Sequence, residues 1–198
     1  MGKSFRKRNM QKESIIDKCF RKHKWFFARI CFKKNGHIIN NSKTVTDSLS
    51  RDNFIYYENF LDIEKYVNQF DTYLGKPLNP EINRAIPILT ALGCAYKCTF
   101  CEHAVLGNKH HSLGAEAIIE QVNYYRENFN IDSFAFFDEE FFLDKNRAYK
   151  LPELLAKNPY KIRWGTQARA SDIHEKYLNK EFLMELEKSG CVRFAMGI

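Results

Sequence analysis

The chain has 198 residues, 44% of them apolar, which allows one domain with a hydrophobic core and excludes a wholly disordered protein. Its formal charge of +7 is unevenly spread. Residues 1–37 hold 12 of the 31 Lys and Arg residues but only 2 of the 24 Asp and Glu residues. Such an arm can bind nucleic acid or an anionic surface, or simply keep the chain in solution. Nothing beyond this arm indicates nucleic-acid binding.

No run of the sequence approaches the ~20 apolar residues that span a bilayer, and no apolar segment follows the basic start, so neither a membrane span nor a secretory signal is expected. Of the six cysteines, three lie within eight residues, and Cys19, Cys31 and Cys191 are scattered. This distribution favours a metal site in a reducing compartment over a disulfide framework. We therefore expect a cytoplasmic protein.

Residues 1–84 are predicted to form a basic N-terminal extension and linker, mainly helical or irregular. The pair Asn35-Gly36 is a turn signal. Apolar residues at three- and four-residue intervals indicate that part of the segment 53–74 is helical. Gly75, Pro77 and Pro80 then mark a linker.

From residue 85 to residue 198, apolar runs that are typical of strands alternate with amphipathic segments that are typical of helices. This alternation predicts an α/β fold whose parallel strands are joined by right-handed crossovers. Asp144 is a candidate N-cap for the second helix, and Pro152 is expected to kink or split that helix. The expected strands are Ile86–Leu92, Ser133–Phe137, Ile162–Gln167 and Val192–Met196, and two expected helices are Ala115–Asn128 and Lys180–Lys188, the latter ending at Gly190.

Polar and reactive residues follow the predicted strands. They are a cysteine-rich loop, the run Asp138-Glu139-Glu140, Arg169 and Gly197. Since reactive groups of parallel sheets gather at the carboxyl ends of the strands, these positions form the candidate site.

The cysteine-rich loop has the spacing C-x3-C-x2-C, formed by Cys94, Cys98 and Cys101. An iron–sulfur cube is normally closed by four thiolates, so three thiolates leave one iron free for another ligand. Zinc is the competing metal, because a histidine could supply a fourth ligand, although structural zinc sites usually pair two short motifs. The available histidines are His103, His110 and His111.

With Phe100 just before its last cysteine, the motif resembles that of the radical S-adenosylmethionine superfamily. The resemblance covers roughly residues 85–198. It includes the strand Ile86-Pro87-Ile88-Leu89-Thr90, the run from Phe136 to Phe142, the strand end from Trp164 to Arg169 and the segment from Gly190 to Ile198. The branch most resembled is often fused to cobalamin-binding domains. The implied fold is a partial, TIM-like (β/α) barrel with parallel strands that is incomplete at the C-terminus, because the chain stops after the fourth core strand.

The resemblance implies that Cys94, Cys98 and Cys101 each ligate one iron of a [4Fe–4S] cluster whose free iron chelates S-adenosylmethionine. A reductant such as a flavodoxin or ferredoxin would supply the electron that cleaves the cofactor to a 5′-deoxyadenosyl radical. The radical would then abstract hydrogen from an unknown substrate. The resemblance also implies cofactor-binding roles for five residues: Phe100 beside the adenine, Asp138 and Glu139 at the methionine ammonium, Arg169 at the methionine carboxylate, and Gly197 on the fourth strand.

Two features depart from this family. The chain stops at Ile198, so it covers only the first part of the barrel and leaves a strand edge that favours a partner chain. The cobalamin signature Asp-x-His-x-x-Gly is absent, since His37 follows Gly36, and cobalamin binding is not expected. The alternative function is therefore a non-catalytic or degenerate iron–sulfur-binding fragment that needs a partner chain. A third reading is a zinc-binding module whose basic arm touches nucleic acid.

Overall fold

A computed structural model describes residues 31–34, 36–40, 56–59, 62–69, 73–76, 78–101 and 109–197. The chain divides into two compact units, Met1–Thr46 and Asp47–Ile198. Within the described residues, no helix has the length and apolar character needed to cross a membrane. The predicted boundary between residues 84 and 85 stays a prediction.

The described part of the first unit is a β-hairpin. Strands β1 (Cys31–Lys34) and β2 (His37–Asn40) pair antiparallel, with Lys34 opposite His37. Gly36 has a φ of 85°, a left-handed value that glycine adopts without steric cost. The turn at Gly36 thus joins two strands, whereas the sequence favoured a helical or irregular arm; Asn35 lies outside the described residues.

The second unit is built on a four-stranded parallel sheet, confirming the predicted α/β class. Its strand order is β3 (Ala85–Ile88), β6 (Ser133–Phe136), β7 (Arg163–Arg169) and β8 (Cys191–Gly197). Neighbours in the sheet are also successive in the chain, as in a partial barrel that winds in one direction. The barrel is not closed. The carboxyl ends of all four strands consequently lie at one edge of the sheet.

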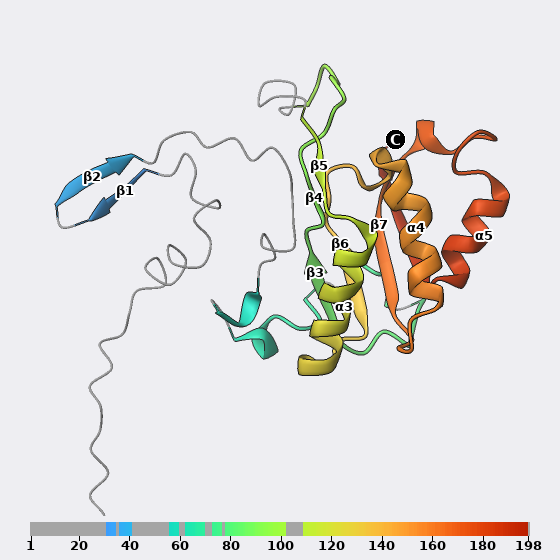
Figure 1. Ribbon diagram of the computed structural model, residues 1–198, viewed down its shortest axis with the longest axis horizontal. Coiled ribbons are helices and arrows are strands. Elements are labelled where there is room, and N and C mark those ends of the chain that lie inside the picture. Colours follow the sequence, from blue (N-terminus) through green and yellow to red (C-terminus); the bar gives the residue numbers. More distant parts are fainter. Residues whose placement is uncertain are drawn as a thin grey trace, which may run out of the picture. The chain divides into compact units, whose positions relative to one another are not determined.

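Three helices connect these strands and cover one face of the sheet (Figure 1). They are α3 (Ala115–Phe129), α4 (Lys145–Ala156) and α5 (Lys180–Lys188). The core beneath them is strongly aromatic. Trp164 is fully buried at ring-centroid distances of 5.4 Å from Phe136 and 5.7 Å from Phe141. Its indole N–H donates to the carbonyl and hydroxyl oxygens of Ser189, which satisfies the one polar atom of the side chain.

The opposite face of the sheet is covered in part by residues that precede β3. Leu74 and Ile82 are fully buried in a small cluster with Ala85 and Ala135. Along β6, Phe134 and Phe136 belong to the core beneath the helices, and Ala135 lies between them in the sequence. Successive side chains of a strand point to opposite faces of the sheet, so the cluster with Ala135 lies on the face away from the helices.

The first predicted strand differs from the one observed. The first strand is split into β3 and β4 (Ala91–Leu92), because the N–H groups of Thr90 and Ala91 donate to a carboxylate and leave the sheet ladder. Part of the segment 53–74 was predicted to be helical, and its described residues form two 3-10 turns, η2 (Tyr57–Asn59) and η3 (Ile63–Lys65).

Pro152 does not split α4 into two helices, contrary to that part of the prediction. The helix is continuous from Lys145 to Ala156, and Pro152 is buried on the face that also carries Leu151 and Leu155. Packing of this apolar face against the sheet offsets the backbone hydrogen bond that proline cannot donate.

Candidate functional site

The three motif cysteines lie on one loop. The chain leaves the four-stranded sheet after β3 and forms β4 before the loop begins. The loop starts after β4 and returns through β5 (His111–Ser112), which pairs antiparallel with β4. Cys94, Cys98 and Cys101 are half-buried and not disulfide-bonded, and the N–H of Cys101 donates to the Cys98 carbonyl at 3.1 Å. The pair of strands β4 and β5 forms the base of the loop, and we call this pair the loop neck. The loop lies at the carboxyl edge of the sheet (Figure 1).

The donor set of this loop fits an iron–sulfur cluster. Three free thiols are available on one short segment, and thiolate sulfur is the usual ligand of iron in such clusters. In the described part of the chain, no three His, Cys, Asp or Glu side chains gather closely enough to hold a metal ion. Burial raises the pKa of Cys94, while a backbone hydrogen bond from Tyr96 and the charge of Arg169 oppose this shift.

Asp138 follows β6 and is fully buried behind the neck of the loop. One carboxylate oxygen accepts the N–H groups of Thr90 at 2.6 Å and Ala91 at 2.8 Å. The other accepts the Thr90 hydroxyl at 2.6 Å and the Arg147 guanidinium at 3.2 Å. Both oxygens are therefore engaged by the protein, and the structure places Asp138 as a support of the loop neck.

The next two carboxylates of the acidic run differ in exposure. Glu139 is exposed, and its carboxylate accepts the N–H of Gly93 at 3.1 Å, at the start of the cysteine loop. Glu140 is buried and accepts the N–H of Phe142. Burial, followed by the charge of Asp172, raises the pKa of Glu140 to about 7. Of the acidic run, Glu139 is thus the accessible carboxylate beside the loop.

Arg169 ends β7 and contacts the cysteine loop directly. Its guanidinium lies over the ring of Tyr96, 3.5 Å from the centroid, in a cation–π arrangement. Tyr96 stands between Cys94 and Cys98, so this contact ties the end of the third strand to the middle of the motif. The predicted convergence of Arg169 and the cysteines is observed.

The remaining candidates fall at separate places. Phe100 is 91% exposed on the loop. Gly197 pairs with Arg169 in the register of β7 and β8, so the ends of these two strands are side by side. His103 lies outside the described residues. Burial lowers the pKa of His110, a half-buried residue near the end of the loop, and His111 is paired within β5.

Sequence reasoning missed Arg147, which lies in the first turn of α4. Its side chain is 1% exposed and donates to Thr90, Asp138 and the Phe141 carbonyl. A buried arginine needs such partners, but its position in an otherwise ordinary amphipathic helix gave no motif. In the sequence, only Asp138 indicated that a buried arginine could be needed as its partner.

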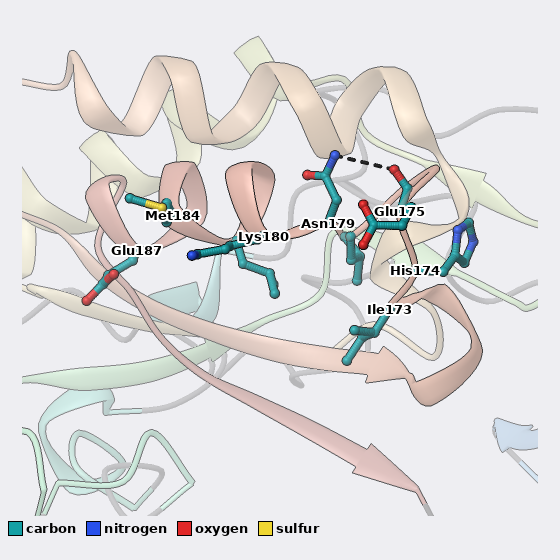
Figure 2. A pocket seen from close by; sticks show the side chains of 9 residues that line it. Ile173, His174, Glu175, Asn179, Lys180, Met184 and Glu187 are labelled. Carbon is teal, nitrogen blue, oxygen red and sulfur yellow. Dashed lines mark hydrogen bonds between the residues drawn. The ribbon is translucent and has the colours of Figure 1, made fainter.

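A separate pocket lies between the turn that follows β7 and helix α5 (Figure 2). Ile173, Met184 and Lys180 are among its lining residues, and Asn179 donates to the Glu175 carbonyl at 3.4 Å beside it. None of the predicted site residues lines this pocket.

Comparison with known proteins gives matches that cover between 56% and 85% of the chain. The uncharacterized methyltransferase PH0819 of Pyrococcus horikoshii is 24% identical over 112 residues, which are 56% of this chain and 23% of that protein. TsrM from Kitasatospora setae, a radical S-adenosylmethionine methyltransferase solved with tryptophan and a cofactor analogue, is 22% identical with a TM-score of 0.49, over 57% of this chain and 22% of TsrM. OxsB, a cobalamin-dependent S-adenosylmethionine radical enzyme, is 22% identical with a TM-score of 0.49, over 85% of this chain and 24% of OxsB. The chain thus spans about a quarter of the length of these relatives.

The model of one protein family, described as the Radical SAM superfamily, matches residues 88–198. This match contains the cysteine loop, all three connecting helices and the strand ends described above. The family implies a [4Fe–4S] cluster and S-adenosylmethionine as cofactors. Because the match covers more than half of the sequence, the chain belongs to the Radical SAM superfamily.

Proposed function

We propose that residues 85–198 form the cluster-binding part of a radical S-adenosylmethionine enzyme and that residues 1–84 are an extension and linker. One observation carries the proposal: three free thiols stand on a single loop whose neck is fixed at the carboxyl edge of a parallel sheet. In this proposal Cys94, Cys98 and Cys101 hold the cluster. When bound, the cluster supplies the electron that cleaves S-adenosylmethionine to methionine and a 5′-deoxyadenosyl radical.

The residues around the loop would bind and orient the cofactor. Glu139 is exposed next to Gly93 and can accept hydrogen bonds from an ammonium group while it holds the start of the loop. Arg169 lies over the loop, and its planar guanidinium can pair with a carboxylate on the side away from Tyr96. Gly197 lies next to Arg169 and presents backbone without a side chain. Exposed Phe100 would cover the adenine.

The engaged carboxylate of Asp138 supports a different role from the one that the resemblance implies. With four donors on its two oxygens and no exposed surface, it has little capacity to accept a ligand ammonium. We therefore propose that it positions the cysteine loop. A cytoplasmic location and a flavodoxin or ferredoxin as reductant belong to the same proposal.

Anaerobic reconstitution tests this proposal. The purified chain is incubated with iron and sulfide, reduced with dithionite and supplied with S-adenosylmethionine, and bound iron, bound sulfide and released 5′-deoxyadenosine are measured. Cys94→Ser should abolish both cluster and product. Cys191→Ser is the matched control, because Cys191 is also a free cysteine but belongs to β8.

Three outcomes have distinct meanings. A cluster together with 5′-deoxyadenosine supports the enzyme. A cluster without that product supports the non-catalytic alternative. A colourless protein that retains zinc contradicts both.

A further inference from the structure

The two ends of the cysteine loop are fastened to one short segment of the chain, the turn between β6 and α4. Three side chains of this segment make the contacts: Asp138, Asp144 and Arg147. We call this group the loop clasp. Its members come from the end of a strand, the N-cap of a helix and the first turn of that helix.

At the incoming end of the loop, Asp138 accepts three hydrogen bonds from Thr90 and Ala91. These contacts take the N–H groups of Thr90 and Ala91 out of the sheet ladder at the point where β4 begins. The chain therefore leaves the sheet at a fixed point and turns into the loop neck. All three residues are fully buried.

At the outgoing end, the hydroxyl of Ser112 donates to one carboxylate oxygen of Asp144 at 2.5 Å. The other oxygen of Asp144 accepts the N–H of Arg147 at 3.1 Å and so caps α4. The N–H of Leu113 donates to the Thr90 carbonyl at 2.9 Å, which joins the outgoing end to the incoming one.

Arg147 contacts both fastenings, its backbone N–H donating to Asp144 and its side chain lying at the incoming end. Its Nη1 donates to the carbonyl of Thr90 at 3.2 Å, to the hydroxyl of the same residue at 3.1 Å and to Asp138 at 3.2 Å. Its Nη2 donates to the Phe141 carbonyl at 2.6 Å, and its guanidinium lies 4.6 Å from the ring centroid of that residue. A buried ion pair gives little net stability compared with apolar packing, and in some proteins such pairs serve instead to select one arrangement.

We propose that the loop clasp positions the cysteine loop for its cluster, with the Arg147 side chain holding the incoming end in place. This inference rests on the proposed function, because the loop is taken to be the cluster loop. A clasp that fixes both ends of the loop restricts the positions that the three thiols can occupy in the iron-free chain. The entropy lost on cluster binding is thereby reduced, and the restrained loop binds the cluster more tightly than an unrestrained one would.

The principal test substitution is Thr90→Val, which removes the hydroxyl shared by Asp138 and Arg147 while keeping shape and the buried ion pair. Thr166→Val is the matched control. Thr166 is also fully buried in the same sheet, and its hydroxyl donates to the Phe136 carbonyl at 3.2 Å, without contact to the clasp. Arg147→Lys is the second variant: it keeps the charge but cannot bridge the carbonyls of Thr90 and Phe141 at once.

Two readouts separate the inference from the proposed function. The first is amide hydrogen exchange across residues 90–93 and 109–113 in the iron-free chain. Thr90→Val should raise exchange there by about tenfold or more, whereas Thr166→Val should not. The second is iron bound per chain after reconstitution, which should fall for Thr90→Val and Arg147→Lys at a temperature where circular dichroism shows all variants folded.

Equal exchange and equal iron in the Thr90→Val and Thr166→Val variants would overturn the clasp. If the unaltered chain takes up no iron but Thr90→Val still raises exchange at the loop neck, the proposed function fails while the fastening of the loop stands. If the unaltered chain binds a cluster and the variants bind it equally well, the inference fails while the proposed function stands.

Discussion

Gly93, the first residue after β4, is predicted to decide whether the cysteine loop can close. Its φ is 77°, and a Cβ added there would lie 2.1 Å from the carbonyl oxygen of Lys109 on the returning side of the loop. The substitution Gly93→Ala therefore forces the two sides of the neck apart. The antiparallel pairs Ala91–Ser112 and Leu92–His111 lie immediately behind this point and should open.

The cost can be worked from two contributions. The left-handed backbone conformation costs roughly 1–2 kcal/mol for a residue with a Cβ. Relief of the 2.1 Å approach adds strain of similar size, because the neighbour is backbone and cannot rotate away. Together they give about 2–4 kcal/mol, which lowers the melting temperature by roughly 4–16 °C for a chain of this size.

Gly190 offers a matched control at the other edge of the sheet. Its φ is 91°, and an added Cβ would lie 2.0 Å from the carbonyl oxygen of Ile162. Gly190→Ala should therefore lower the melting temperature, followed by circular dichroism, by a similar amount. Iron uptake, measured at a temperature where both variants are folded, should fall only for Gly93→Ala. Equal iron uptake by the two variants, or an unchanged melting temperature for Gly93→Ala, would refute the reasoning.

Three further predictions concern the acidic run, the cysteine loop and the aromatic core. Burial, followed by the charge of Asp172, raises the pKa of Glu140 from 4.5 to about 7. Between these pH values the folded chain keeps a proton on Glu140 that the unfolded chain releases. The free energy of unfolding therefore falls as the pH rises from 4.5 to 7. Glu140→Gln should flatten this dependence and stabilise the chain above pH 7 by roughly 1–3 kcal/mol, measured as urea midpoints at several pH values; an unchanged slope would contradict it. Tyr96→Leu removes the ring beneath Arg169 and should lower the free energy of unfolding by about 0.5–1 kcal/mol. Iodoacetamide should then label the loop thiols of the iron-free chain faster, and an unchanged rate would argue against the contact. Trp164→Phe removes the indole donor from the buried Ser189 carbonyl, while the Ser189 hydroxyl keeps its bond to the Leu186 carbonyl, and should cost about 1–3 kcal/mol in thermal unfolding. A loss below about 0.5 kcal/mol would show that the indole N–H is dispensable.

The fold was predictable because its signals are local. Amphipathic periodicity predicted α3 and α5 within a residue or two, and Asp144 was recognised as a cap from its residue type alone. Alternation of strands and helices then required a parallel sheet, whose geometry brings the strand ends together. The position of Arg169 beside the cysteine loop follows from that topology.

The parts that could not be predicted depend on contacts between distant residues. Asp138 resembled a ligand-binding carboxylate in the sequence, but its burial and its bonds to Thr90 arise only when β3 and β6 are paired. The split of the first strand has the same origin. The role of Arg147 likewise requires α4 to pack against the loop neck, and no spacing rule records such a tertiary contact.

The central claim is that three loop cysteines hold a cluster with one iron open to S-adenosylmethionine. Electron paramagnetic resonance of the reconstituted, dithionite-reduced chain tests it most directly, with and without added S-adenosylmethionine. We predict a reduced [4Fe–4S] signal whose g values shift when the cofactor is added, and no such signal in Cys98→Ser. A signal that is indifferent to S-adenosylmethionine, or one that survives in Cys98→Ser, would contradict the account.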